Sequence, residues 1–378
     1  MLFSDIAGNK EVKKKLIETV LENRISHAQL FLGKKGSGNL ALAFAYAQFI
    51  SCIDKKADDA CNACSSCVKY KKWVHPDLHI TFPFSSTKEK PYCKSVLPEF
   101  REMMGRHPYP AEEDWYQALN MGNKQGIIPR DEAEDIVRTL SLTTYESEYK
   151  TVVIWLPEKM NTVAANVLLK TLEEPPRKTL FILVAESLEQ ILPTILSRTQ
   201  IVRVASAGLE EMTEALTRMH GVDEKQARDI AYMADGDMHA AMQSIAPEKE
   251  TIHHPDQFLN WMRSCYAFSS NMVNILAISE TLGGLGRERQ KDFLMFGLQM
   301  IRESMLLHCN VNLSRFNDEE QKTFQKFSAL ISPSVTQRLL DEFNLALSHV
   351  ERNGNWKIIF LDLSMKAGAV MRAGKPSS

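Results

Sequence analysis

Short apolar runs alternate along the first half of the chain with segments whose apolar residues recur at helical spacing. The runs 28–32, 151–156 and 179–184 are almost wholly apolar, which is typical of strands buried on both faces of a sheet. Helical spacing marks three further segments: residues 9–23, 40–50 and 163–172. Because strands alternate with helices, the pattern predicts an α/β domain with a parallel sheet covered on both faces.

Two other stretches break this alternation. Between about residues 82 and 126, five prolines punctuate a polar, aromatic-bearing segment: Pro83, Pro91, Pro98, Pro108 and Pro110. We predict that this segment is a partly irregular insertion. After about residue 205 only helical spacing recurs, as in residues 337–350, where Leu339, Phe343 and Leu347 fall on one face. The predicted domains are an α/β domain (1–205), a small helical domain (206–250) and an all-α domain (251–378).

Composition narrows the class of protein. The chain has 378 residues, enough for two or three domains, and 44% of them are hydrophobic and 24% charged. No stretch approaches the roughly 18 apolar residues that a membrane span needs, so no membrane partner is expected. The first residues lack the pattern of an export signal, which predicts a cytoplasmic protein. A net charge of −2 argues against coating nucleic acid by bulk electrostatics.

A glycine loop directly follows the first predicted strand and reads Gly33-Lys34-Lys35-Gly36-Ser37-Gly38-Asn39-Leu40. An active phosphate-binding loop ends in Lys, for the phosphates, and Ser or Thr, for magnesium. Here Asn39 and Leu40 stand at those positions. The glycines Gly33, Gly36 and Gly38 therefore predict a tight strand-to-helix turn that does not bind ATP productively. A weak hold on phosphate through Lys34 and Lys35 is the alternative.

The strand at 151–156 lacks the second part of a phosphoryl-transfer site. Acidic residues at its end would hold the metal and polarise a water, but the chain reads Trp155-Leu156-Pro157 there. Glu158 lies two residues beyond Leu156 and would need a shift of register to replace them. Two independent elements of ATP hydrolysis are thus missing.

Four of the seven cysteines cluster as Cys52, Cys61, Cys64 and Cys67. Two Cys-x-x-Cys steps turn neighbouring thiolates onto one ion, and a fourth thiolate closes a tetrahedral site without an open position. The spacing predicts a structural Zn²⁺ module at about residues 52–75. A redox pair or free thiols are the alternatives. Just beyond, Lys69-Tyr70-Lys71-Lys72-Trp73 interleaves basic and aromatic residues, which fits either single-stranded nucleic acid or a solvated helix face.

Two motifs resemble the clamp-loader branch of the AAA+ family. They are the run from Asn166 through Leu172-Glu173-Glu174-Pro175-Pro176, and Leu192-Pro193-Thr194-Ile195-Leu196-Ser197-Arg198-Thr199. The opening Phe3-Ser4-Asp5-Ile6-Ala7-Gly8-Asn9 is similar to the same family. The likeness covers about the first 200 residues. It implies a three-layer AAA+ domain with a zinc insertion, a helical lid and a helical collar.

The resemblance also implies roles for individual residues. In that family a Ser-Arg-Cys segment supplies an arginine finger to the ATP site of a neighbouring subunit, and Ser197-Arg198-Thr199 matches it with Thr in place of Cys. Arg198 is then the one residue with a catalytic role, acting in trans. Pairing of Arg198 with a surface carboxylate is the alternative. In the lid, His239 stands where active members carry a phosphate-sensing Arg, and we expect it to be solvated or capping.

The implied protein is a non-hydrolysing subunit of the DNA polymerase III clamp loader. Its implied partners are gamma/tau motor subunits and a delta subunit, with the sliding clamp and primed DNA reached through the complex. An active gamma/tau-type motor is one alternative, against which Asn39 and Leu40 argue. A zinc-dependent nucleic-acid-binding regulator is the other, and it has no need of Arg198.

Overall fold

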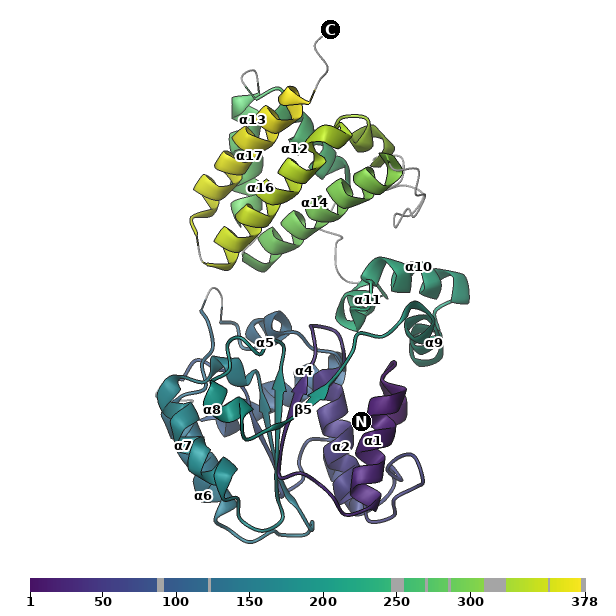
Figure 1. Ribbon diagram of the computed structural model, residues 1–378, viewed down its shortest axis with the longest axis vertical. Helices are drawn as coiled ribbons and strands as arrows, with labels where there is room; N and C mark the ends of the chain where they lie inside the picture. The colour runs from purple at the N-terminus through teal and green to yellow at the C-terminus, as the bar shows by residue number, and fades with distance from the viewer. Residues whose placement is uncertain are drawn as a thin grey trace. The chain divides into compact units, whose positions relative to one another are not determined.

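The computed structural model describes most of the chain, and Figure 1 shows how the elements are arranged. The described residues are 1–86, 92–121, 124–245, 255–268, 271–284, 287–308, 324–352 and 354–374. The chain forms two compact units, Met1–Ala246 and Pro247–Ser378, and each is described by itself.

The first unit is built on one parallel sheet of five strands. Their order across the sheet is β2-β3-β4-β1-β5, and every neighbouring pair is parallel. The strands are β1 (Ala28–Leu32), β2 (Leu78–Thr81), β3 (Lys150–Trp155), β4 (Thr179–Ala185) and β5 (Gln200–Arg203). The predicted parallel α/β fold and its three strands are confirmed. The two edge strands were not predicted, because each has only four residues and β5 is mostly exposed.

Alternate residues of the central strands belong to two separate cores, so helices must cover both faces. In β4, Leu180, Ile182 and Val184 pack in the core that contains α2. Their neighbours Phe181, Leu183 and Ala185 pack in the core that contains α6 and α7. This period of two follows from the pleat of a strand. Figure 1 shows the resulting three layers, with α1 and α2 on one side of the sheet and α6 and α7 on the other.

The helices of the first unit fall into a covering set and a terminal set. The covering helices are α1 (Lys10–Leu21), α2 (Asn39–Ser51), α3 (Ser65–Lys71), α4 (Leu97–Arg106), α5 (Glu112–Ala118), α6 (Arg130–Leu140), α7 (Thr162–Glu173) and α8 (Pro193–Leu196). The terminal set follows β5 and is called the lid helices below: α9 (Leu209–His220), α10 (Glu224–Ala234) and α11 (Met238–Ile245). The lid helices share their apolar residues with the core around α2.

The stretch 82–126, predicted to be a partly irregular insertion, contains both helices and irregular segments in its described residues. Its described residues include α4 and α5, and Pro98 occupies the first turn of α4, where a missing N–H does no harm. Phe100 of α4 stacks on Phe82 with ring centroids 4.6 Å apart and also meets Trp115 and Trp155. The helices were not predicted, because proline marks a helix start as readily as a break. The segment is part of the main core.

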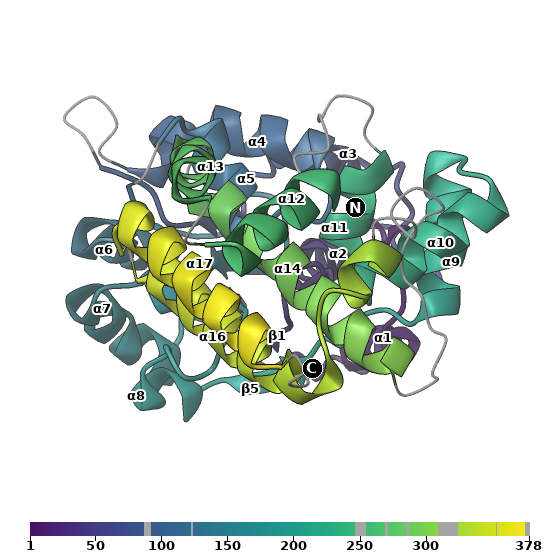
Figure 2. The same ribbon diagram turned by 90° about the horizontal axis from the view of Figure 1, so that it is seen from above.

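The second unit is helical throughout its described residues. Its helices are α12 (Pro255–Tyr266), α13 (Met272–Gly284), α14 (Arg287–His308), α16 (Pro333–Glu351) and α17 (Trp356–Ala373). Helix α16 lies beside α14 and α17 in both Figure 1 and Figure 2. The one-sided spacing predicted for 337–350 is confirmed, since Leu339 and Phe343 are fully buried. The sequence predicts a loose tail at residues 374–378, of which 375–378 lie outside the described residues.

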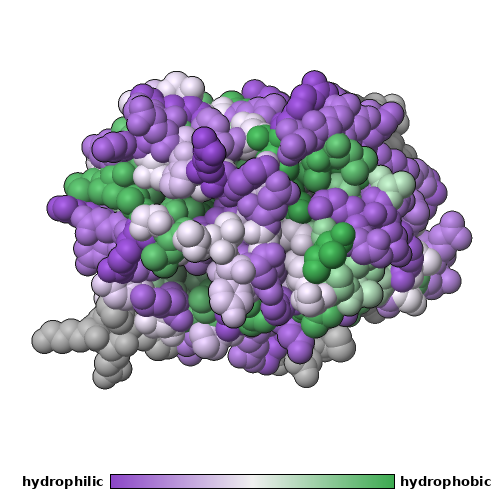
Figure 3. Space-filling view, turned by 90° about the horizontal axis from the view of Figure 1, so that it is seen from below, coloured by the Kyte–Doolittle hydropathy of each residue, from purple (hydrophilic) through white to green (hydrophobic). Residues whose placement is uncertain are grey.

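Among the described residues, no helix is both long and apolar enough to cross a lipid bilayer. On the face drawn in Figure 3, hydrophobic areas are separated by hydrophilic ones. Large exposed apolar side chains such as Ile53, Leu142 and Tyr145 occur individually along the sequence.

Phe100→Ala should lower the free energy of unfolding of the first unit by about 3–5 kcal/mol, because it removes a fully buried ring and leaves a cavity. Denaturant unfolding followed by tryptophan fluorescence measures this, since Trp115 and Trp155 adjoin the site. Tyr145→Ala, at an 83% exposed position, is the matched control and should change little. A loss below about 1 kcal/mol for Phe100→Ala would mean that the segment is only peripheral.

Candidate functional site

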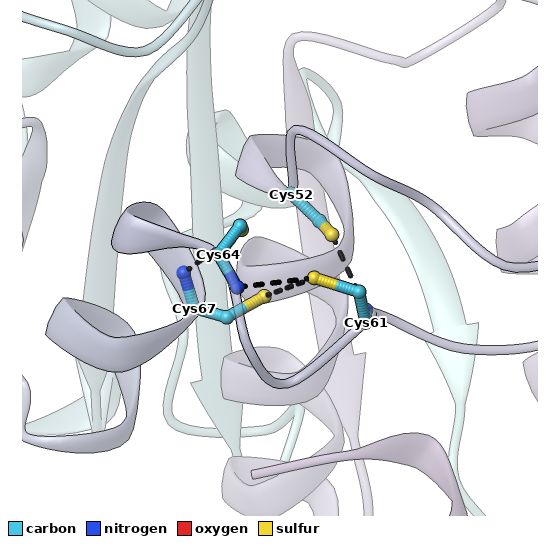
Figure 4. Close-up of side chains that lie close together, drawn as sticks. All are labelled: Cys52, Cys61, Cys64 and Cys67. Atoms are coloured by element: carbon cyan, nitrogen blue, oxygen red, sulfur yellow. Dashed lines mark hydrogen bonds between the residues drawn. The ribbon is translucent and has the colours of Figure 1, made fainter.

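The four clustered cysteines lie together at the carboxyl end of α2. Cys52 caps α2, and Cys64 caps the start of α3, where its sulfur accepts a hydrogen bond from the backbone N–H of Cys67. All four Sγ atoms lie within 4.8 Å of one another, and Figure 4 shows the side chains converging. The predicted set is therefore brought together in space as well as in sequence.

The geometry fits a metal ion. The Sγ atoms of Cys61 and Cys67 are 3.9 Å apart, close to the roughly 3.8 Å edge of a tetrahedron with Zn–S bonds of about 2.3 Å. Backbone N–H groups of Cys61 and Cys64 donate to the sulfurs of Cys52 and Cys61, at 3.3 Å each. Such donors stabilise thiolates, the form that binds metal. These four cysteines could hold a metal ion.

The thiol pKa values show why the cluster calls for a cation. Backbone N–H donors from Ala63 and Cys64 lower the pKa of Cys61. Burial opposes ionisation of Cys64, but backbone and thiol donors outweigh it and lower its pKa to about 6. Burial raises the pKa of Cys52 and of Cys67. The surroundings thus favour ionisation of Cys61 and Cys64 and oppose it at Cys52 and Cys67, whereas a metal ion would bind all four as thiolates.

Residues next to the cluster do not extend it. The ring of His75 accepts a hydrogen bond from the Asp77 N–H at 3.1 Å and packs on Tyr70, and its carbonyl accepts from the Leu78 N–H, which makes it a turn residue. Tyr70 is buried and Trp73 meets Phe44 edge-on. Tyr70 is thus not available to stack on a base and Trp73 is partly buried, which favours the solvated helix face over single-stranded nucleic acid.

The phosphate loop, residues 33–40, joins β1 to α2 as predicted. Gly36 and Gly38 have φ values of 71° and 81°, which other residues rarely adopt. The Asn39 amide donates to the carbonyls of Gly33 and Ala185, at 3.1 Å each. Leu40 is buried. The side chain at the lysine position therefore closes the loop onto β4 and carries no charge.

The lid helices press directly on this loop. The backbone N–H of Met238 donates to the carbonyl of Gly36 at 3.1 Å. A β-carbon at Gly36 would overlap the carboxylate of Asp237. His239 is buried and its Nε2 lies 2.7 Å from Oδ2 of Asp114, so the expectation of a solvated or capping residue was wrong. Tertiary packing on α5 buries this histidine.

Two carboxylates reach the ends of β3 and β4. Leu156 has a φ of 56°, and this left-handed turn brings Glu158 back so that its Oε1 accepts from the Glu186 N–H at 3.0 Å. Burial raises the pKa of Glu158. Burial, with the neighbouring Glu158, Glu113 and Glu112 carboxylates, raises the pKa of Glu186 to about 7. Glu158 thus lies near the strand ends without any shift of strand register.

Arg198 lies apart from the loop, between α8 and β5. Its guanidinium pairs with the Glu173 carboxylate, with Nε 2.7 Å from Oε1, and donates to the Thr194 carbonyl at 2.8 Å. The surface carboxylate weighed as an alternative is therefore present, and it belongs to the Leu-Glu-Glu-Pro-Pro motif. The ion pair joins the two motifs that carry the family resemblance. Sequence reasoning identified both motifs but missed that they touch.

The chain matches the protein family described as "DNA polymerase III, delta subunit" over residues 8–207, which is more than half of its length. The subunit delta' of Bacillus subtilis is 30% identical over 189 residues, covering 50% of this chain and 45% of that protein. The subunit delta' of Pseudomonas aeruginosa is 30% identical over 173 residues, covering 46% and 41%. The chain thus matches less than half the length of these relatives.

A more distant relative is the subunit tau of Bacillus subtilis, 24% identical over 64% of this chain and 36% of that protein. Among solved structures, a gamma subunit-related protein of Thermotoga maritima aligns with 96% of this chain and 99% of its own, at 15% identity and a TM-score of 0.41. A TM-score of 0.41 does not establish a common fold. On the match over residues 8–207 and the likeness to several delta' subunits, the chain belongs to the DNA polymerase III delta-subunit family, as a clamp-loader subunit of the delta-prime type.

Proposed function

We propose that this chain is the non-hydrolysing member of an AAA+ clamp loader and that Arg198 completes the ATP site of a neighbouring subunit. The observation that carries the proposal is the placing of Arg198 at the opposite edge of the sheet from the phosphate loop. Arg198 precedes β5, whereas the loop follows β1.

The parallel register makes this separation quantitative. Gln29 of β1 lies opposite Gln200 of β5 and Leu32 lies opposite Arg203, so Arg198 precedes the paired residues and Gly33 follows them. The four residues from Gln29 to Gly33 alone span about 13 Å at about 3.3 Å per residue. Arg198 is thus suited to a phosphate held by another chain, where a trans arginine is worth about a thousandfold or more in rate.

Three features of the loop support the absence of productive ATP binding. The side-chain amide of Asn39 donates hydrogen bonds to the carbonyls of Gly33 and Ala185. The buried Leu40 offers no hydroxyl to magnesium. The lid helices contact the loop at Gly36, where backbone N–H groups would otherwise surround phosphate. An active gamma/tau-type motor would need all three to differ.

A structural Zn²⁺ held by Cys52, Cys61, Cys64 and Cys67 completes the proposal. When bound, the ion supplies the positive charge that lets four neighbouring thiols ionise. The module also anchors the amino terminus, since Asp59 accepts from the N–H groups of Phe3 and Ser4 at 3.1 and 3.0 Å. The described residues thus link the cysteine loop to the opening Phe3-Ser4-Asp5 segment.

The partners follow from the family. Relatives of this chain include subunits named tau and gamma, so we infer that it assembles with gamma/tau and delta subunits. Through them it would load the sliding clamp on primed DNA. A free-standing nucleic-acid-binding regulator is disfavoured because Tyr70 is buried and Trp73 is packed on Phe44.

Cys64→Ser should abolish stoichiometric zinc binding and increase protease cleavage near residues 52–75, because three ligands no longer close the site. Metal analysis of the purified chain and limited proteolysis measure the two effects. Cys93→Ser is the matched control: this buried thiol outside the cluster donates to the Phe82 carbonyl, and a serine hydroxyl can do the same. Full zinc occupancy in the Cys64→Ser variant would show that the proposed four-cysteine zinc site is wrong.

The isolated chain should show no saturable binding of Mg²⁺–ATP up to about 1 mM, corresponding to a binding free energy weaker than about −4 kcal/mol. Equilibrium dialysis with labelled ATP measures it. The B. subtilis tau subunit, a named relative, serves as the parallel sample. Micromolar affinity of this chain would restore the motor-subunit alternative.

In a clamp loader reconstituted with this chain, Arg198→Ala should lower the rate of ATP hydrolysis stimulated by primed DNA. The loss should equal about the contribution of the one ATP site that Arg198 completes, because a trans arginine raises the hydrolysis rate at its site by about a thousandfold. Arg130→Ala, which removes an exposed arginine paired within α6, is the matched control and should leave turnover unchanged. Equal turnover for both variants in fully assembled complexes would disprove the trans role.

A further inference from the structure

The first turn of α5 carries three consecutive acidic residues, and each contacts a different element around the phosphate loop. Glu112 pairs with Lys159 Nζ at 2.7 Å, just beyond the end of β3. Glu113 pairs with Lys35 Nζ of the loop itself at 3.2 Å. Asp114 meets Nε2 of His239, in the lid helix α11, at 2.7 Å. One helical turn therefore bridges the loop, the sheet and the lid helices.

The contact between Asp114 and His239 is a buried polar pair. Asp114 and His239 are 8% and 6% exposed, and Oδ2 of Asp114 also accepts from the Ala111 N–H at 2.9 Å, which fixes its orientation. Burial alone would raise the pKa of Asp114, but the hydrogen bond and charge of His239 lower it to about 2. Asp114 is therefore ionised at neutral pH, and a buried carboxylate needs this partner.

The segment leading into α5 covers the other end of the loop. Tyr109 is buried, and its hydroxyl accepts from the Ala7 N–H at 2.8 Å. A β-carbon at Gly38 would lie 2.8 Å from the Tyr109 ring. The ring thus sits over the start of α2, between the opening segment and the loop. With the Met238–Gly36 contact, the loop is covered from both sides.

These contacts bring carboxylates of the same chain to the loop lysine, to the end of β3 and to the lid helices. The N–H groups and lysine of an active phosphate loop attract phosphate because it is anionic. Here carboxylates of the same chain pair with Lys35 and with the lid helices. We propose that the first turn of α5 is a built-in ligand of this degenerate site, holding the lid helices closed on the loop in place of a nucleotide.

The proposal deepens the proposed function, because it rests on the absence of productive ATP binding at the same loop. It gives the segment 92–121 a purpose: the subunit keeps one lid position at all times, independent of nucleotide. Glu112, Glu113 and Asp114 are positioning residues in this scheme, since they touch no substrate. Asp114 contributes most to holding the lid helices, because its pair with His239 is buried whereas the two pairs with lysine are partly exposed.

Amide hydrogen exchange of the isolated full chain tests the proposal. Asp114→Asn keeps the size of the side chain and its bond from Ala111 but loses the charge. It should raise exchange at residues 236–243, including the Met238 N–H, by about tenfold, while β3 and β4 keep wild-type protection. Asp131→Asn, at an exposed acid in the first turn of α6, is the matched control and should behave as wild type.

If Asp114→Asn also exposes β3 and β4, global unfolding has intervened, and the exposed-pair variant Glu113→Gln decides, with faster exchange expected at residues 33–40. Wild-type exchange in both variants would overturn the proposal. Adding Mg²⁺–ATP to the wild-type chain should leave residues 33–40 and 236–243 unchanged. Protection by ATP would overturn the proposed lack of binding instead, and the variants would still report on α5.

Discussion

Burial of the central strands on both faces is the constraint on which the first unit depends. Strands β3, β4 and β1 have almost no exposed side chains, so the sheet is stable only with a helical layer on each side. Parallel strands then require a helical crossover each time. The same crossovers bring the phosphate loop to the carboxyl edge and Arg198 to the amino edge. The separation of the two sites is therefore a consequence of topology and does not depend on any one side chain.

At the carboxyl edge, polar groups of the phosphate loop are paired within the chain. Asn39 uses its amide on two backbone carbonyls, Met238 donates to Gly36, and Glu113 pairs with Lys35. Leaving the buried carbonyls of Gly36 and Ala185 unpaired would cost about 1–3 kcal/mol each. The loop therefore keeps its backbone groups paired although Asn39 and Leu40 stand where an active phosphate loop has lysine and a hydroxyl.

The amino edge and the cysteine loop carry the groups to which the proposed function assigns partners. Arg198 contacts Glu173, the Thr194 carbonyl and the Ser197 hydroxyl, an exposed arrangement that contributes little to stability. The four cysteine sulfurs lie at distances that suit a metal ion. The proposed partners are a neighbouring subunit for Arg198 and Zn²⁺ for the cysteines.

The sequence by itself determined the long apolar strands, the glycine loop with Asn39 and Leu40, and the cysteine set, because each depends on local residue type and spacing. It did not reveal β2 and β5, which are too short and, for β5, too polar to show a strand pattern. The prolines of 82–126 concealed helices whose aromatic residues join the core, since a sequence cannot say whether a proline starts a helix or interrupts one.

Only the tertiary structure decided the contacts between distant segments. The left-handed turn at Leu156 returns Glu158 to the strand end, and Glu173 meets Arg198 from a different helix. Asp114 and His239 are 125 residues apart and form one buried pair. Such pairs depend on how helices pack against the sheet, which no periodicity along the chain encodes. The residue types of the phosphate loop can thus be read along the chain, whereas the contacts that surround the loop depend on packing.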